Sequence, residues 1–169
     1  MKNLFLLIGL SLFFVSCTNT YYIVRHAEKA SAGTNGGMMS NDPPLSEKGA
    51  ERAQALREVL KDKKIGYIFS TNTIRTKTTA EPTREFFGLS IQTYSPMPRD
   101  SFILQLKSLK KNVLIVGHSN TIDDVVNKLS GTKHVPGDLD ESVYDNLYIL
   151  RKKGRTMKFE NKKYGAPTP

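Results

Sequence analysis

The chain of 169 residues contains a single cysteine, Cys17, and no tryptophan. One cysteine cannot close a disulfide within the chain, and beyond residue 17 no thiol nucleophile is present. The three histidines and the cysteine show no zinc-binding spacing, and no RNA-binding signature occurs. These absences exclude a disulfide scaffold and a cysteine enzyme within residues 18–169, and they make nucleic acid a weak candidate partner.

Positive charge, in contrast, is abundant. Lysine and arginine number 25 against 16 acidic residues, so the net charge is +9 and the sequence pI is about 9.6. Such an excess favours anionic partners, namely nucleic acid, an anionic membrane surface or a phosphorylated small molecule. The densest basic cluster comprises Arg151, Lys152, Lys153 and Arg155. A hydrophobic content of 38% and a charged content of 24% are typical of a globular domain.

The first 17 residues form a pattern of their own. Lys2 precedes an apolar run from Leu4 to Val15, and the small Ser16 stands before Cys17. This is the pattern of a secretory signal, and the run is shorter than the roughly 20 residues of a membrane span. Residues 1–17 are therefore predicted to be a signal peptide, followed by a single domain over residues 18–169.

The end of this segment resembles the lipobox of bacterial lipoproteins. The resemblance implies that Cys17 is lipidated and becomes the mature N-terminus. The protein would then be exported and anchored by lipid in the bacterial cell envelope, facing the periplasm. The alternative is an ordinary signal peptide, or an uncleaved anchor, in which the cysteine is incidental.

Hydrophobic periodicity predicts alternating strands and helices after residue 18. Ser46 is a good N-cap, Gly131 ends a helix, and Pro82 is expected to kink or interrupt one. Lys153 and Gly154 are expected to form the turn between two final strands. The predicted strands are 20–26, 64–71, 90–96 and 112–120, with two more inside 142–165, and the predicted helices are 45–62, 73–88, 99–111 and 121–131. The alternation indicates an α/β sheet covered on both faces.

Three predicted strands end in reactive side chains. Arg25 and His26 end the first, Ser70 ends the second with Arg75 just beyond it, and His118 ends the fourth. Because ligands bind beyond the carboxyl ends of strands in such sheets, we expect these residues to surround one pocket.

Two arginines and two histidines around one pocket form an anion site. Guanidinium groups match the oxygens of a phosphate, and nearby positive charge lowers the pKa of a histidine, which keeps it free to attack phosphorus. No metal is required, and the neighbouring arginines argue against a cation site. His134 lies in a Gly/Pro loop and is assigned no function.

Four segments together resemble the histidine phosphatase superfamily, the phosphoglycerate-mutase-like group. They are VRHAEK, NDPPLSEKGAERAQAL, FSTNTIRTKTTA and VLIVGHSN, in the order of the family. The resemblance implies a three-layer α/β/α sandwich with a mixed, mainly parallel sheet. It also implies that His26 is the phosphorylated nucleophile, with Arg25, Arg75 and His118 completing the phosphate pocket. Asp100 is the candidate proton donor by position, although an acid at a helix start is also simply a good N-cap.

The resulting hypothesis is a phosphatase without metal or cofactor that hydrolyses small phosphomonoesters through phosphorylated His26. One alternative is a phosphohistidine (phosphoramidate) phosphatase, whose substrates have a better leaving group and need no proton donor. Another is a non-catalytic lipoprotein that binds a phosphorylated ligand. A third is an envelope protein whose basic face meets anionic lipid, which explains the net charge of +9 but not the two histidine segments. The sequence leaves the oligomeric state open.

Overall fold

The computed structural model describes residues 18–31, 42–154 and 156–169. The predicted signal peptide with Cys17 lies outside the described residues, as do residues 32–41. The strands are β1 (Thr18–Arg25), β2 (Ile65–Thr71), β3 (Ile91–Tyr94), β4 (Asn112–Gly117), β5 (Asn146–Lys153) and β6 (Thr156–Lys163). The helices are α1 (Glu47–Leu60), α2 (Ile74–Phe87), α3 (Asp100–Ser108) and α4 (Ser119–Ser130).

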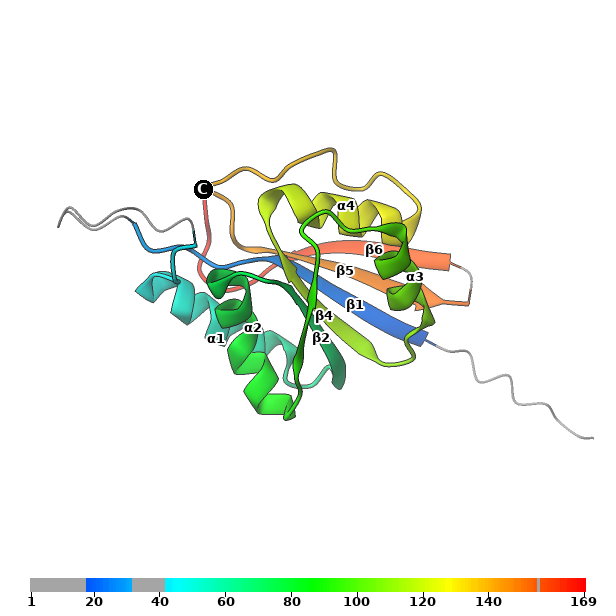
Figure 1. The fold of residues 1–169 in the computed structure, drawn as a ribbon, viewed down its shortest axis with the longest axis horizontal. Helices are drawn as coiled ribbons and strands as arrows, with labels where there is room; N and C mark the ends of the chain where they lie inside the picture. Colours follow the sequence, from blue (N-terminus) through cyan, green and yellow to red (C-terminus); the bar gives the residue numbers. More distant parts are fainter. Residues whose placement is uncertain (1–17, 32–41, 155) are drawn as a thin grey trace, which may run out of the picture.

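The strands form one mixed sheet in the order β3-β2-β4-β1-β5-β6. β3, β2, β4 and β1 are mutually parallel, whereas β5 runs antiparallel to both β1 and β6. Helices α1 and α2 cover one face of the sheet, and α3 and α4 cover the other (Figure 1). The structure is thus the three-layer, mainly parallel α/β/α sandwich that the sequence predicted.

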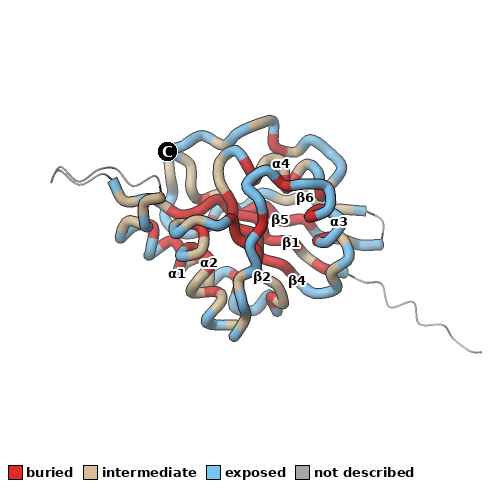
Figure 2. The backbone as a smooth tube through the Cα atoms, viewed as in Figure 1, coloured by how far each residue is buried: buried red, intermediate tan, exposed pale blue. Residues whose placement is uncertain are grey.

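The central strands are buried on both faces, which accounts for their continuous apolar sequences. In β1, Tyr21 and Ile23 pack under α3 and α4, while Tyr22 and Val24 pack under α1 and α2. Side chains of a strand alternate between its two faces, so each face needs its own apolar set. Figure 2 shows the buried backbone concentrated in these central strands. No helix in the described ranges is long and apolar enough to cross a membrane.

Local signals set most helix ends as expected. Ser46 caps α1, accepting a hydrogen bond from the Gly49 amide at 3.1 Å, and Gly131 ends α4 with a φ of 74°. The prediction for Pro82 was wrong, because α2 runs through it without interruption. Proline removes one backbone donor, and the packing of the buried face of α2 on its neighbours outweighs that loss. This face consists of Thr76, Thr79, Ala80 and Thr83.

A buried ion pair fixes the chain where it leaves β1. Arg52 of α1 donates to both carboxylate oxygens of Glu28, at 2.9 and 2.7 Å, and to the carbonyl oxygens of Tyr164 and Ala166. Burial works to raise the pKa of Glu28, but the hydrogen bonds and charge of Arg52 outweigh it and hold that pKa below its usual value. A Cβ atom on Gly49 would lie 2.2 Å from the Glu28 carbonyl oxygen, so this approach requires glycine.

Candidate functional site

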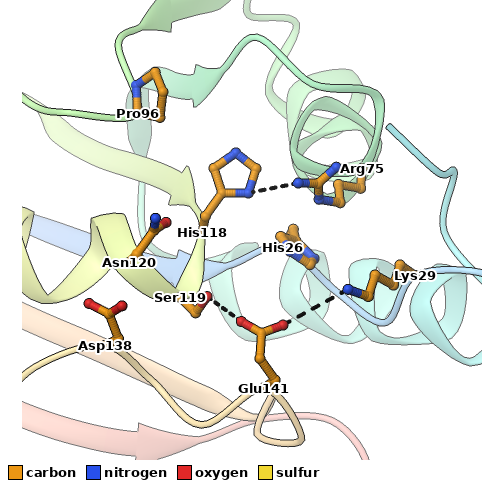
Figure 3. Close-up of a pocket in the computed structure, with 9 residues that line it drawn as sticks. All are labelled: His26, Lys29, Arg75, Pro96, His118, Ser119, Asn120, Asp138 and Glu141. Atoms are coloured by element: carbon orange, nitrogen blue, oxygen red, sulfur yellow. Dashed lines mark hydrogen bonds and ion pairs between the residues drawn. The ribbon is translucent and has the colours of Figure 1, made fainter. Parts of the chain in front are cut away.

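A pocket of about 460 Å³ opens at the carboxyl ends of β1 and β4 (Figure 3). Three of the predicted residues, His26, Arg75 and His118, line it. The other lining residues are Lys29, Pro96, Ser119, Asn120, Asp138 and Glu141. The structure therefore brings the ends of β1 and β4 together with the first turn of α2, whereas Ser70, near the end of β2, does not line the pocket.

His26 follows directly on β1 and is only 3% exposed. Its backbone amide donates to the Gly117 carbonyl at 2.8 Å, which extends the β1–β4 ladder by one residue. Its ring atom Nδ1 lies 2.8 Å from the Ala27 carbonyl oxygen, an acceptor, so in the neutral ring Nδ1 carries the proton and Nε2 keeps a lone pair. Burial, aided by the charges of Arg25 and Arg75, lowers the pKa of His26 to about 3. The imidazole is therefore neutral near pH 7 and can act as a nucleophile.

His118 is the N-cap residue of α4, and its ring centroid lies 5.4 Å from that of His26. An Arg75 amino group donates to His118 Nδ1 at 3.3 Å, which leaves the proton of the neutral ring on Nε2. That proton is directed to the Thr71 hydroxyl at 2.9 Å, and Thr71 in turn donates to Thr76. Burial and the charge of Arg75 lower the pKa of His118 to about 4.

Arg75 enters the pocket from the first turn of α2. Its guanidinium forms an ion pair with Asp42 at 3.0 Å, and the other Asp42 oxygen accepts the Ile74 amide at 2.7 Å. Asp42 belongs to the NDPPLS segment before α1. A carboxylate thus engages Arg75 at the pocket wall, where a phosphate oxygen could take its place.

Arg25 does not line the pocket, although the sequence placed it there. Its guanidinium donates to the carbonyl oxygens of Asp140 and Val143 and to the Glu141 carboxylate at 2.6 Å, and it lies 4.3 Å from the centre of the Tyr144 ring. The Arg25 guanidinium is thus held by the loop after α4, while the His26 ring lines the pocket beside His118. Arg25 borders the pocket through its ion pair with Glu141 and through the effect of its charge on the pKa of His26.

Asp100 is not brought to the pocket either. It is the exposed first residue of α3, and in the segment 95–100 only Pro96 lines the cavity. The Thr121 hydroxyl donates to the Pro96 carbonyl at 2.9 Å, which binds this segment to α4. Asp100 therefore lies in the first turn of α3, where an acid is favourable, but the N-cap residue is Arg99 and not Asp100.

Two acidic residues line the pocket, Asp138 and Glu141, and the sequence analysis did not predict either of them. Both lie in the connection between α4 and β5, which has no periodic pattern. Burial works to raise the pKa of Glu141, but hydrogen bonding from Ser119 and the charges of Arg25 and Lys29 hold it below its usual value. Glu141 is therefore a carboxylate at neutral pH. The described residues contain no cluster of three or more His, Cys, Asp or Glu side chains suited to a metal ion.

Thr79 was also missed, and it joins the two sides of the site. Its hydroxyl is fully buried, accepts the Ala27 amide at 2.9 Å and donates to the Arg75 carbonyl at 2.7 Å. The loop that carries His26 is thereby tied to the helical turn that carries Arg75. A threonine one turn after Arg75 was the available signal in the sequence.

Comparison with known proteins agrees with this site. Residues 21–96 match the model of the histidine phosphatase superfamily (branch 1), a range that includes His26 and Arg75. The fold and the site described above agree with this match. No curated protein is significantly similar in sequence to the chain.

Solved structures of this fold cover nearly the whole chain. A protein of Agrobacterium tumefaciens assigned as the phosphohistidine phosphatase SixA has a TM-score of 0.62 and 22% identity, covering 88% of this chain and 98% of its own. Phosphoglycerate mutase from Bacillus anthracis has a TM-score of 0.62 and 14% identity, covering 87% and 93%. Mycobacterial glucosyl-3-phosphoglycerate phosphatase has a TM-score of 0.58 and 15% identity, covering 89% and 100%. At these identities the likeness concerns the fold.

Replacing Thr79 by valine tests the link between the two sides of the site. The variant keeps the shape of the side chain but leaves the buried Ala27 amide unpaired, so we expect the free energy of unfolding to fall by about 1–3 kcal/mol. The matched control is Thr83→Val on the same buried helix face, where the hydroxyl has no hydrogen-bond partner in the described chain. The control should be neutral or stabilising in urea unfolding. Equal losses in the two variants would contradict the assignment.

The low histidine pKa values predict loss of stability in mild acid. Between pH 6.5 and 5 the unfolded chain binds protons on His26 and His118 that the folded chain, with pKa values of about 3 and 4, does not bind. The free energy of unfolding therefore decreases as the pH falls, by at most about 1.4 kcal/mol per pH unit for each histidine. Urea unfolding at pH 7.5, 6 and 5 measures this. His26→Gln should reduce the dependence, and identical stability of the wild type at all three values would refute the pKa shifts.

Proposed function

We propose that the protein is a phosphatase that forms a phosphohistidine intermediate on His26. The observation that carries the proposal is the state of His26, a buried neutral imidazole whose Nδ1 faces the Ala27 carbonyl. Its Nε2 lone pair is thus available in a pocket that also contains Arg75 and His118. A nucleophile beside a guanidinium is the arrangement that phosphoryl transfer needs, because catalysis rests on positioning and on stabilising the charge of the phosphoryl oxygens.

The proposed reaction has two steps. In the first, His26 Nε2 attacks phosphorus, an N–P bond forms, and the bond from phosphorus to the leaving group breaks. In the second, water attacks phosphorus, the N–P bond breaks, inorganic phosphate leaves and His26 regains its lone pair. Arg75, released from Asp42, and His118 would hold the phosphoryl oxygens in both steps.

The leaving group decides which substrate class fits. An alkoxide leaving group needs a proton, yet Asp100 lies outside the pocket and Glu141 is held as a carboxylate by Arg25 and Ser119. Asp138 is the other acid on the pocket wall and is the proposed donor. A phosphoramidate such as phosphohistidine is the second candidate substrate, because it needs less help from an acid. The similarity in fold to the SixA protein supports this candidate.

The site is open and polar, which suits a small phosphorylated substrate. We further propose that the protein is exported and held to the cell envelope through lipid on Cys17. This proposal is supported by the apolar run from Leu4 to Val15, with Ser16 directly before the cysteine.

Hydrolysis of p-nitrophenyl phosphate by the full chain, with EDTA present, tests the proposed nucleophile. We expect turnover by the wild type and a loss of at least about a thousandfold in His26→Ala, because the group that attacks phosphorus is removed. The control is His134→Ala, since His134 stacks on Phe159 away from the pocket. A His26→Ala variant with full activity would rule out the nucleophile. Hydrolysis of neither this ester nor phosphoramidate by the folded wild type would contradict the phosphatase and favour the alternative of a non-catalytic protein that binds phosphorylated ligands.

Variants of Asp138 and Asp100 test which of the two aspartates donates the proton to the leaving group. Asp138→Asn should slow hydrolysis of alkyl phosphates by about tenfold or more, and that of p-nitrophenyl phosphate much less, because an aryl oxide needs less protonation. Asp100→Asn, at the exposed start of α3, should leave both rates unchanged. Equal effects of Asp138→Asn on the two substrates would contradict its role as the proton donor.

A further inference from the structure

The first residues of β1, β2 and β4 lie together at one end of the sheet, and the pocket lies at the opposite end. We refer to the end with these first residues as an edge of the sheet. Thr18, the first residue of β1, pairs with Lys153 at the end of β5. The Thr20 amide donates to the side chain of Asn112, the first residue of β4, and Asn112 pairs with Ile65, the first residue of β2. Figure 1 shows the start of β1 beside the turn between β5 and β6. Segments far apart in the sequence therefore share one surface.

This surface is strongly basic. Lysines precede β2 and β4 and flank the β5–β6 turn, and each of those named next is exposed. We call them the basic edge: Lys63, Lys64, Lys110, Lys111, Lys153 and Lys158. In the described part of the chain none of the six forms an ion pair, whereas nearby Lys61 and Arg151 are neutralised by Glu58 and Glu160.

The basic edge carries much of the net charge of +9, and its lysines lie outside the pocket wall. At the pocket, Arg75 and Arg25 are paired with Asp42 and Glu141. Much of the excess positive charge therefore lies away from the phosphate pocket. A surface of unpaired lysines attracts a broad polyanion through charge alone.

We propose that the basic edge docks on the surface of an anionic membrane. The segment directly before Thr18 contains the apolar run from Leu4 to Val15, so the chain enters the domain at this edge without a linker. An apolar or lipidated segment held in a bilayer would bring the six lysines to the headgroups. Lysines beside a membrane anchor bind anionic lipid within about one Debye length, and one lipid chain alone holds a protein weakly.

The geometry also sets the orientation of the pocket. β1 runs from Thr18 at the basic edge to Arg25 beside the pocket, eight residues in all. At about 3.3 Å per residue its ends lie roughly 23 Å apart. When the basic edge faces the headgroups, the pocket faces away from the bilayer and stays open to soluble substrates.

Binding of the full chain to vesicles tests the proposal. Vesicles of phosphatidylcholine are compared with vesicles that contain about 30 mol% phosphatidylglycerol. The apolar segment contributes equally to binding of the two kinds of vesicle, so the ratio of the two affinities isolates the effect of lipid charge. We expect at least about tenfold tighter binding to the anionic vesicles, lost in roughly 0.5 M NaCl because salt screens the attraction.

Two matched quadruple variants locate the surface. Lys63→Gln, Lys110→Gln, Lys153→Gln and Lys158→Gln together should abolish the preference for anionic vesicles. The same number of changes away from the basic edge, at Lys48, Lys77, Lys133 and Lys162, should retain most of it. Thermal unfolding of both variants checks their fold, and the salt dependence of the wild type tests the proposal independently of either variant.

Three results would overturn the proposal. They are equal affinity for the two vesicles, an anionic preference that the edge variant retains, and tighter binding of a short RNA than of the vesicles with the same loss in the edge variant. The last result would assign the surface to nucleic acid. None of these measurements uses hydrolysis, so they stand apart from the test of the phosphatase.

Discussion

The parallel pairing of β1 with β4 is the constraint on which the rest of the site depends. Arg25 pairs with Gly117, so His26 and His118 leave adjacent strands at the same height. The amide of His26 continues the ladder to Gly117 at 2.8 Å, which fixes the nucleophile candidate to the strand that carries the second histidine. Because both strands are buried on both faces, the two rings are held by the core and not by a surface loop.

The unliganded pocket is close to electrically balanced. Asp42 and Glu141 engage the guanidiniums of Arg75 and Arg25, and each carboxylate comes from a connection outside the sheet. A phosphate that enters must exchange with a carboxylate, so part of the attraction is offset by an ion pair that breaks. The two carboxylates pair the buried Arg25 and the partly buried Arg75, and both come from connections that can differ in sequence without disturbing the strands.

The sequence predicted the secondary structure well where apolar runs or helix-capping residues give a local signal. Apolar runs ending in histidine located β1 and β4, and Ser46 and Gly131 marked helix ends correctly. It failed for Pro82, because packing of the buried face of α2 outweighed a local breaking signal. It did not reveal the partners of Arg25, because the loop that supplies them has no periodic pattern.

Asp100 and Glu141 show a different kind of failure. The position of Asp100 relative to the strands suggested the pocket, but the chain turns away after Pro96 and packs on α4. Glu141 lies in an irregular connection whose path depends on tertiary contacts with Arg25 and Ser119. No periodic pattern encodes such a path, so long-range contacts had to be known first.

The length of β1 has a consequence for the electrostatics of the protein. Its ends are separated by roughly 23 Å, more than twice the screening distance of about 8 Å in physiological salt. Through solvent, the lysines at one end therefore contribute little to the potential felt by a substrate at the other. The high isoelectric point is then no guide to substrate charge, and each end can change its charge in evolution without altering the other.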